Sequence, residues 1–199
     1  MSTLATTNLK NPSSGSNNIV LATDGSTTIT TLNSTTITGT SVRGAITSGT
    51  AVASTSGTSI DFTSIPSWVK RVTVMFNGVS LSGTSAILMQ IGAGSVTTSG
   101  YASSTLFSLG TAVNTSGSTA GFVLSTDASA AALVGGTVQI VTLGSNIWAA
   151  SGSASLSSSE FSNCAGRVSL SGTLDRIRIT TVNGTDTFDA GSINILYEG

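Results

Sequence analysis

Apolar and polar residues alternate in short stretches along most of the chain. In residues 174–180, Ile177 and Ile179 alternate with Arg176 and Arg178. A period of two places the isoleucines on one face of a β-strand and the arginines on the other. This stretch therefore predicts a strand with one face in a core and the other in water.

Comparable stretches recur from residue 50 onward, separated by turn signals such as Asn-Gly and Ser-Gly. Residues 86–91 are apolar almost throughout, which predicts a strand that is buried on both faces or lies at a subunit contact. A weak helix pattern covers only residues 128–133. The expected strands are residues 58–62, 70–76, 86–91, 120–124, 136–141, 147–150, 166–170, 174–180 and 191–197. The pattern predicts an all-β fold, with an antiparallel β-sandwich or jelly-roll domain over residues 51–199.

Residues 1–50 differ from the rest, because they contain no aromatic residue and consist of short Thr-rich segments. Asp24-Gly25 between two such segments predicts a hairpin. So few large apolar side chains cannot close a core alone, since their burial does not offset the chain entropy. We therefore expect a thin β-segment that folds only with partners. These partners are either copies of the same segment or a complementary binding site on a larger assembly. The expected oligomerisation or attachment residues are Ile19, Val20, Leu21, Ile29 and Ile37.

The composition excludes several classes of function. The 199 residues include seven Lys or Arg, eight Asp or Glu, one Cys and no His, and 8% are charged. Nucleic-acid binding needs clustered basic residues, and most zinc sites and Ser-His-Asp triads need His. We therefore expect a protein that is not an enzyme, with no cofactor, no metal and no nucleic-acid partner.

No apolar run approaches the roughly 18 residues of a membrane helix, and the N-terminus lacks the pattern of a signal peptide. We therefore expect no membrane partner. Ser and Thr make up about a third of the chain, and a surface hydrated by hydroxyls should depend little on salt or pH. The single Cys164 excludes an intrachain disulfide and is expected to be a small buried residue.

Four carboxylates are candidates for chemistry. Asp175, Asp186 and Asp189 are close in sequence, and Asp61 could approach them in a sandwich. Paired carboxylates could cleave glycosides or hold Ca²⁺. The spacing is not that of a calcium loop, however, and solvated or Arg-paired carboxylates at a strand edge explain the pattern equally simply.

Four aromatic residues with polar groups could stack on sugar rings. They are Trp68, Trp148, Tyr101 and Tyr197. Tyr101 is the best ligand-binding candidate, because residues 94–105 contain glycines and serines that resemble a loop, and loops carry recognition. The adjacent basic residues Lys70 and Arg71 indicate a solvated strand edge.

Three segments of the chain have distinctive sequences. The opening Leu9-Lys-Asn-Pro-Ser-Ser-Gly-Ser-Asn-Asn-Ile-Val-Leu21, followed by Asp24-Gly25, resembles the start of structural proteins in tailed bacteriophages, particularly those of cyanobacteria and marine bacteria. Residues 59–78 and 188–197 are similar to a module that recurs in tail fibres and related virion proteins. The resemblance implies a trimeric fibre whose N-terminus docks to the tail or baseplate and whose distal β-domain meets the host surface. Residues 95–165 match no part of this pattern.

The sequence thus predicts a phage virion structural protein, assembled in the host cytoplasm, and most directly a short homotrimeric tail fibre. Its predicted partners are further copies of itself, tail or baseplate proteins, and a host surface glycan. The chain is short for a fibre and has no long shaft repeat, so a capsid decoration or baseplate protein without receptor binding is the alternative. A third possibility is a polysaccharide depolymerase that uses a pair such as Asp186 and Asp189.

Overall fold

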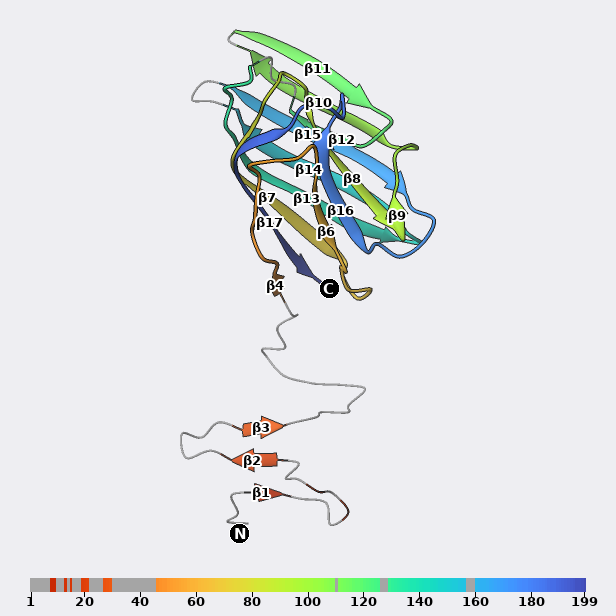
Figure 1. Cartoon of the computed structure of the whole chain (residues 1–199). Helices are drawn as coiled ribbons and strands as arrows, with labels where there is room; N and C mark the ends of the chain where they lie inside the picture. Colours follow the sequence, from red (N-terminus) through yellow and green to blue (C-terminus); the bar gives the residue numbers. More distant parts are fainter. Residues whose placement is uncertain are drawn as a thin grey trace. The chain divides into compact units, whose positions relative to one another are not determined.

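The fold is known from a computed structural model, which describes residues 8–9, 13, 15, 19–21, 27–29, 46–109, 111–125, 129–156 and 160–199. The chain divides into two compact units, Met1–Arg43 and Gly44–Gly199. Every element in the described part of the chain is a β-strand, and all strand pairs are antiparallel (Figure 1). The predicted all-β class is therefore confirmed.

The N-terminal unit contains three short strands, β1 (Asn8–Leu9), β2 (Ile19–Leu21) and β3 (Thr27–Ile29). They form one antiparallel sheet in the order β1-β2-β3. Four of the predicted attachment residues belong to β2 and β3, where Ile19 is opposite Ile29. Ile37 lies outside the described residues. The attachment role of all five residues stays a prediction.

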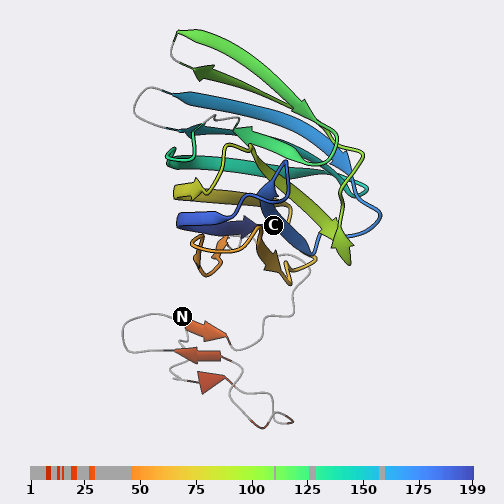
Figure 2. The ribbon, with the colours of Figure 1, turned by 45° about the horizontal axis from the view of Figure 1, so that its top comes forward.

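The second unit is a sandwich of two sheets, visible from two directions in Figures 1 and 2. The larger sheet has nine strands in the order β11-β10-β15-β14-β13-β7-β17-β4, with β5 also paired to β17. Its strands are β4 (Ile46–Ser48), β5 (Val52–Ala53), β7 (Arg71–Leu81), β10 (Ala102–Leu109), β11 (Ala112–Ser118), β13 (Val134–Gly144), β14 (Ile147–Ser155), β15 (Phe161–Ser169) and β17 (Phe188–Glu198).

The smaller sheet has five strands in the order β12-β8-β16-β6, with β9 also paired to β8. Its strands are β6 (Ile60–Thr63), β8 (Ile87–Ala93), β9 (Ser95–Val96), β12 (Phe122–Ser125) and β16 (Arg176–Thr181). The two sheets face each other, which confirms the predicted β-sandwich.

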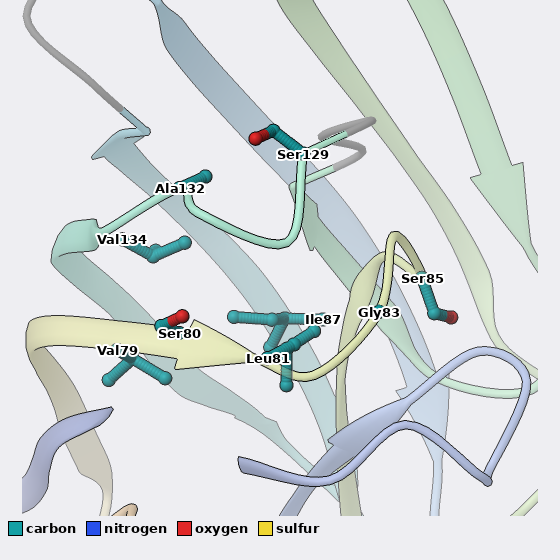
Figure 3. Close-up of a pocket in the computed structure, with 9 residues that line it drawn as sticks. All are labelled: Val79, Ser80, Leu81, Gly83, Ser85, Ile87, Ser129, Ala132 and Val134. Atoms are coloured by element: carbon teal, nitrogen blue, oxygen red, sulfur yellow. The ribbon is translucent and has the colours of Figure 1, made fainter. Parts of the chain in front are cut away.

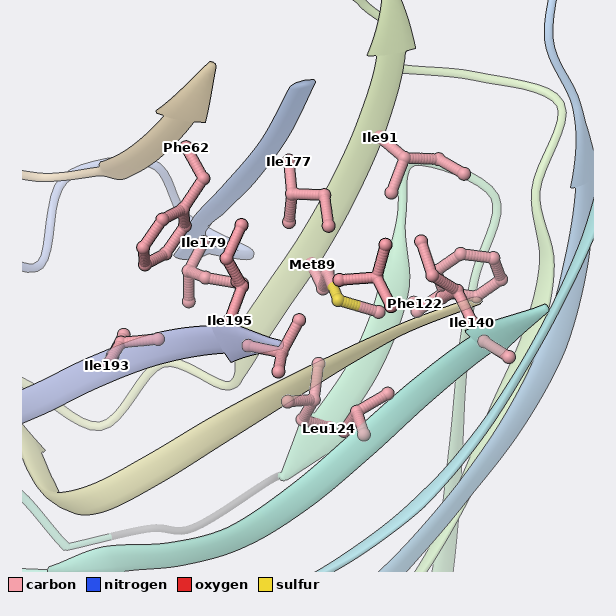
Figure 4. Close-up of a cluster of buried hydrophobic side chains, with 14 of the residues drawn as sticks. Phe62, Met89, Ile91, Phe122, Leu124, Ile140, Ile177, Ile179, Ile193 and Ile195 are labelled. Carbon is pink, nitrogen blue, oxygen red and sulfur yellow. The ribbon is translucent and has the colours of Figure 1, made fainter. Parts of the chain in front are cut away.

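The core lies between the two sheets and follows from the alternation in the sequence. Ile177 and Ile179 of β16 are fully buried, whereas Arg176 and Arg178, which alternate with them, reach solvent. Figure 4 shows these isoleucines in one cluster with Ile193 and Ile195 of β17. Residues 87–92 of β8 are all buried, so the nearly continuous apolar run marks a strand that is covered on both faces.

Two local predictions are wrong. Residues 94–105 are not one loop, because they include β9 and the first half of β10. Residues 129–133 form no helix, and a single turn closes there instead, with Ala132 N donating to Ser129 O at 3.2 Å. So short a segment gains too little from helix propagation to offset nucleation.

The sandwich begins before the predicted boundary at residue 50. Residues 46–48, which the sequence assigned to the N-terminal segment, form β4 and pair with the end of β17. Gly49 N also donates to Ile195 O at 2.7 Å. This pairing covers the edge of β17, which would otherwise expose unpaired backbone groups.

The chain enters and leaves the sandwich at one end of the larger sheet. Ile46 of β4 is opposite Glu198 of β17, and Glu198 is opposite Arg71 of β7. The side chains of Arg71 and Glu198 also form an ion pair. We call this end of the sandwich the entry end.

Candidate functional site

Tyr101, the predicted ligand-binding residue, is part of the core. Only 3% of its surface is exposed, and its ring meets Phe122 edge-on with centroids 4.9 Å apart. Its hydroxyl accepts from Ile91 N at 2.8 Å and lies 3.1 Å from Thr97 O. Burial raises the pKa of Tyr101 to about 12. No face of the Tyr101 ring is open to a sugar. The prediction that Tyr101 binds a ligand is therefore wrong, and its role is structural.

Trp68 is the more exposed tryptophan. It is 43% exposed and packs at an angle against Tyr197, with ring centroids 5.8 Å apart. Trp148, by contrast, is buried in the core. Sequence alone could not separate the two, because each is preceded or followed by an aliphatic residue, Val69 after Trp68 and Ile147 before Trp148.

Three of the four candidate carboxylates accept hydrogen bonds from neighbouring groups. Asp61 accepts two hydrogen bonds from Arg178, at 2.7 and 2.9 Å, across the β6–β16 pair. Asp175 accepts from Arg176 at 2.7 Å, and this guanidinium lowers the pKa of the Asp175 carboxyl. Asp186 accepts from Ser85 N at 2.9 Å. No group of three or more His, Cys, Asp or Glu that could hold a metal ion occurs in the described ranges.

An open cleft of about 410 Å³ lies at the entry end of the sandwich. Three loops of the chain build it, namely the loop before β7, the β13–β14 hairpin and the loop before β16. Its lining residues are Ser67, Val69, Lys70, Thr142, Leu143, Gly144, Ser145, Asn146, Trp148, Thr173 and Leu174. This volume falls within the range of about 300–1,000 Å³ that is typical of ligand sites.

The β13–β14 hairpin forms one wall of the cleft in a specific conformation. Ser145 and Asn146 both have a left-handed backbone, with φ of 49° and 60°. Two consecutive positive φ angles are characteristic of the tight turn that matches the twist of a two-stranded hairpin. The turn is held in place because Asn146 O accepts from Leu170 N at 3.0 Å.

The cleft offers polar groups above an apolar floor. Val69, Trp148 and Leu174 are buried, whereas the hydroxyl, amide and ammonium groups come from more exposed residues. No carboxylate lines the cleft. Lys70 forms no ion pair in the part of the chain that the structure describes, whereas Arg71, Arg176 and Arg178 each do. The arrangement suits hydrogen bonding to an uncharged or anionic polar ligand.

A second hollow lies at the opposite end, beside β7 and the turn before β13 (Figure 3). Val79, Leu81, Ile87 and Val134 give it apolar walls. Its volume of about 20 Å³ admits little more than one water molecule. It is therefore too small for a ligand.

In comparisons with protein families, curated proteins and solved structures, the chain has no significant match. The described residues contain no helix that is long and apolar enough to cross a membrane.

Proposed function

We propose that the chain is a structural protein of a tailed-phage virion, and most specifically a short homotrimeric tail fibre. The observation that carries this proposal is the division into two unlike units. The described part of Met1–Arg43 contains three short strands, whereas Gly44–Gly199 has a core of its own. Such a chain suits docking to the tail or baseplate by the first unit and surface contact by the second.

We assign the host-surface contact to the cleft at the entry end. Hydroxyl and amide groups above an apolar floor match the alternating polar and apolar surfaces of a sugar ring. The ammonium of Lys70 also favours saccharides that carry a carboxylate. Affinity for one sugar would be low, and several copies would compensate through avidity.

Binding of the full chain to host cells or to their purified polysaccharide tests this assignment. Lys70→Ala combined with Thr173→Ala should weaken binding at least about tenfold, since two hydrogen-bonding groups are lost. Thr63→Ala, an exposed change on β6 of the smaller sheet, is the matched control. Equal binding by all three proteins would remove the receptor role of the cleft.

The alternative is an architectural protein of the capsid or baseplate without receptor binding. The position of the cleft favours this alternative, because β4, the first strand of the sandwich, begins at the same end. Immunogold labelling would place the protein on the head or tail hub in this case. Free protein would then fail to block infection, whereas a receptor-binding fibre should block it.

The native mass of the full chain tests the fibre itself. A fibre built from three chains should have a mass near three times 19.7 kDa. A monomer at every concentration would contradict the homotrimer. The protein would then be a subunit that folds its first residues only against another virion protein.

A further inference from the structure

The larger sheet turns one face toward the core and the other away from the smaller sheet. We call the second face the outer face. One row of residues crosses this face, and each residue of the row is opposite the next on the neighbouring strand. The row contains Gly117, Ser104, Ala165, Ser151, Gln139, Thr73, Leu196 and Ser48. Every residue of this row is exposed or half-buried, and none is charged.

Two neighbouring rows on the outer face are also uncharged. One contains Thr115, Leu106, Asn163, Ser153, Thr137, Met75 and Asn194. The other contains Val113, Ser108, Phe161, Ser155 and Gly135. Arg167, Arg71 and Glu198 lie in the next row, at the margin near the entry end.

The outer side of the smaller sheet is different. Asp61, Arg178 and Arg176 lie on it and form charged pairs with each other or with Asp175. Charge is thus concentrated on one side of the sandwich and excluded from the middle of the other. Protein interfaces show the same arrangement, with charge depleted at the centre and retained at the rim.

The uncharged rows also expose large apolar side chains. Val113, Leu106 and Phe161 are 67%, 46% and 48% exposed, and they come from the adjacent strands β11, β10 and β15. Ser108 joins them, since it is opposite Val113 and its hydroxyl accepts from Phe161 N at 3.1 Å. The strand at this side of the sheet, β11, is an edge strand that carries no charge and no proline. Such an edge is prone to association when nothing covers it.

The uncharged area is large enough for a stable contact. The three rows contain eight, seven and five residues, which makes 20 in all. On one face of a sheet each residue occupies about 4.8 Å by about 6.8 Å. The resulting area of about 650 Å² approaches the roughly 800 Å² that each partner buries in a standard interface. A saccharide would cover only a small part of it.

We propose that the outer face is a contact surface between copies of this chain. The number of copies rests on the proposed function, but the contact face does not. A second copy fits this face because both surfaces lack charge at their centres, so no unpaired charge is buried in the contact. The contact holds the sandwich domains together, in addition to any association of residues 1–43.

Thiol labelling of the full chain tests this contact. Ser151→Cys places a thiol in the middle of the outer face, and Thr63→Cys places one on β6 of the smaller sheet, both at exposed positions. The native Cys164 is buried, and burial raises its pKa to about 11, so it contributes little background. We expect a maleimide to label Ser151→Cys at least about tenfold more slowly than Thr63→Cys in the assembled protein.

Equal labelling rates would overturn the proposal, whether the native mass is that of an oligomer or a monomer. An oligomer with equal rates would leave the proposed fibre intact and confine its contacts to other surfaces. Protection of Ser151→Cys that requires added polysaccharide would also overturn the proposal, since a glycan would then cover the face. As a second variant, Ser151→Lys should weaken association at least about tenfold by burying a charge, and Thr63→Lys should not.

Discussion

Buried hydroxyl groups explain how a chain so rich in serine and threonine closes a core. Ser162 Oγ donates to Leu124 O at 2.8 Å, and Thr105 Oγ1 donates to Asn163 O at 2.9 Å. Ser54 Oγ donates to Ala190 O at 2.8 Å. A buried hydroxyl with a backbone partner avoids most of its desolvation penalty. Small hydroxyl side chains can therefore replace apolar ones inside the sandwich.

Tyr101→Phe should lower the free energy of unfolding by about 1–3 kcal/mol, because Ile91 N would lose its buried acceptor. Urea denaturation followed by tryptophan fluorescence measures the change. Tyr197→Phe is the control, since Tyr197 is only partly buried, and its effect should stay within about 0.5 kcal/mol. Equal effects of the two changes would mean that the hydroxyl of Tyr101 is unimportant.

Stability should fall as the pH rises from about 10 to about 12. Burial raises the pKa of Tyr101 from 10.0 to about 12 in the folded chain. The unfolded chain therefore releases this proton first, which stabilises the unfolded state by up to about 3 kcal/mol across this range. Urea midpoints at successive pH values measure the effect. Tyr101→Phe should remove most of it, and an unchanged profile in that variant would contradict the assignment.

The strands with alternating apolar residues were predictable, whereas β10 and β11 were not. Val72, Val74 and Phe76 mark β7 in the sequence because they are the buried face of an alternating stretch. In β10 the buried residue is Thr105, whereas Leu106 beside it is apolar and exposed. The buried face carries a hydroxyl and the exposed face an apolar side chain, so polarity does not mark the period of two and the segment resembles a loop.

The cleft could not be predicted from sequence for a different reason. Its polar residues Lys70, Asn146 and Thr173 come from three loops that meet only in the folded domain. No local pattern marks such a site. The buried role of Tyr101 was hidden in the same way, since it depends on contacts with Phe122 and Ile91.

A glycine in β17 controls how this strand pairs with β7. Gly191 has a φ of 89°, and an added Cβ would lie 2.3 Å from Gly78 O. Gly191→Ala should therefore destabilise the domain by more than about 3 kcal/mol, from backbone strain and overlap together. Thermal unfolding measures this loss.

Gly78→Ala is the matched control for that change. Gly78 also has a left-handed backbone, with a φ of 61°, but its added Cβ would meet nothing within 4 Å. The expected loss is only about 1–2 kcal/mol, from the backbone conformation alone. A loss at Gly191 no larger than that at Gly78 would show that the close approach of the strands is unimportant.

For the whole molecule, we expect thermal stability to be nearly independent of salt. Only three ion pairs occur in the described part of the sandwich, and their side chains are 24–45% exposed. Solvent screens such pairs, so each contributes little to the free energy of unfolding. The melting temperature should therefore change by no more than about 3 °C between about 0.05 M and about 1 M sodium chloride. A larger decrease, seen by calorimetry, would mean that these ion pairs stabilise the fold substantially.

The position of Ile46 opposite Glu198 has a consequence for protein engineering. A domain whose first and last strands end side by side can be inserted into a surface loop of another protein without stretching either partner. The sandwich could therefore be moved as a cassette into an unrelated host protein. In such a chimera, the end with the β10–β11 hairpin would point away from the protein that receives the insertion. That hairpin would be the place to insert a peptide for display.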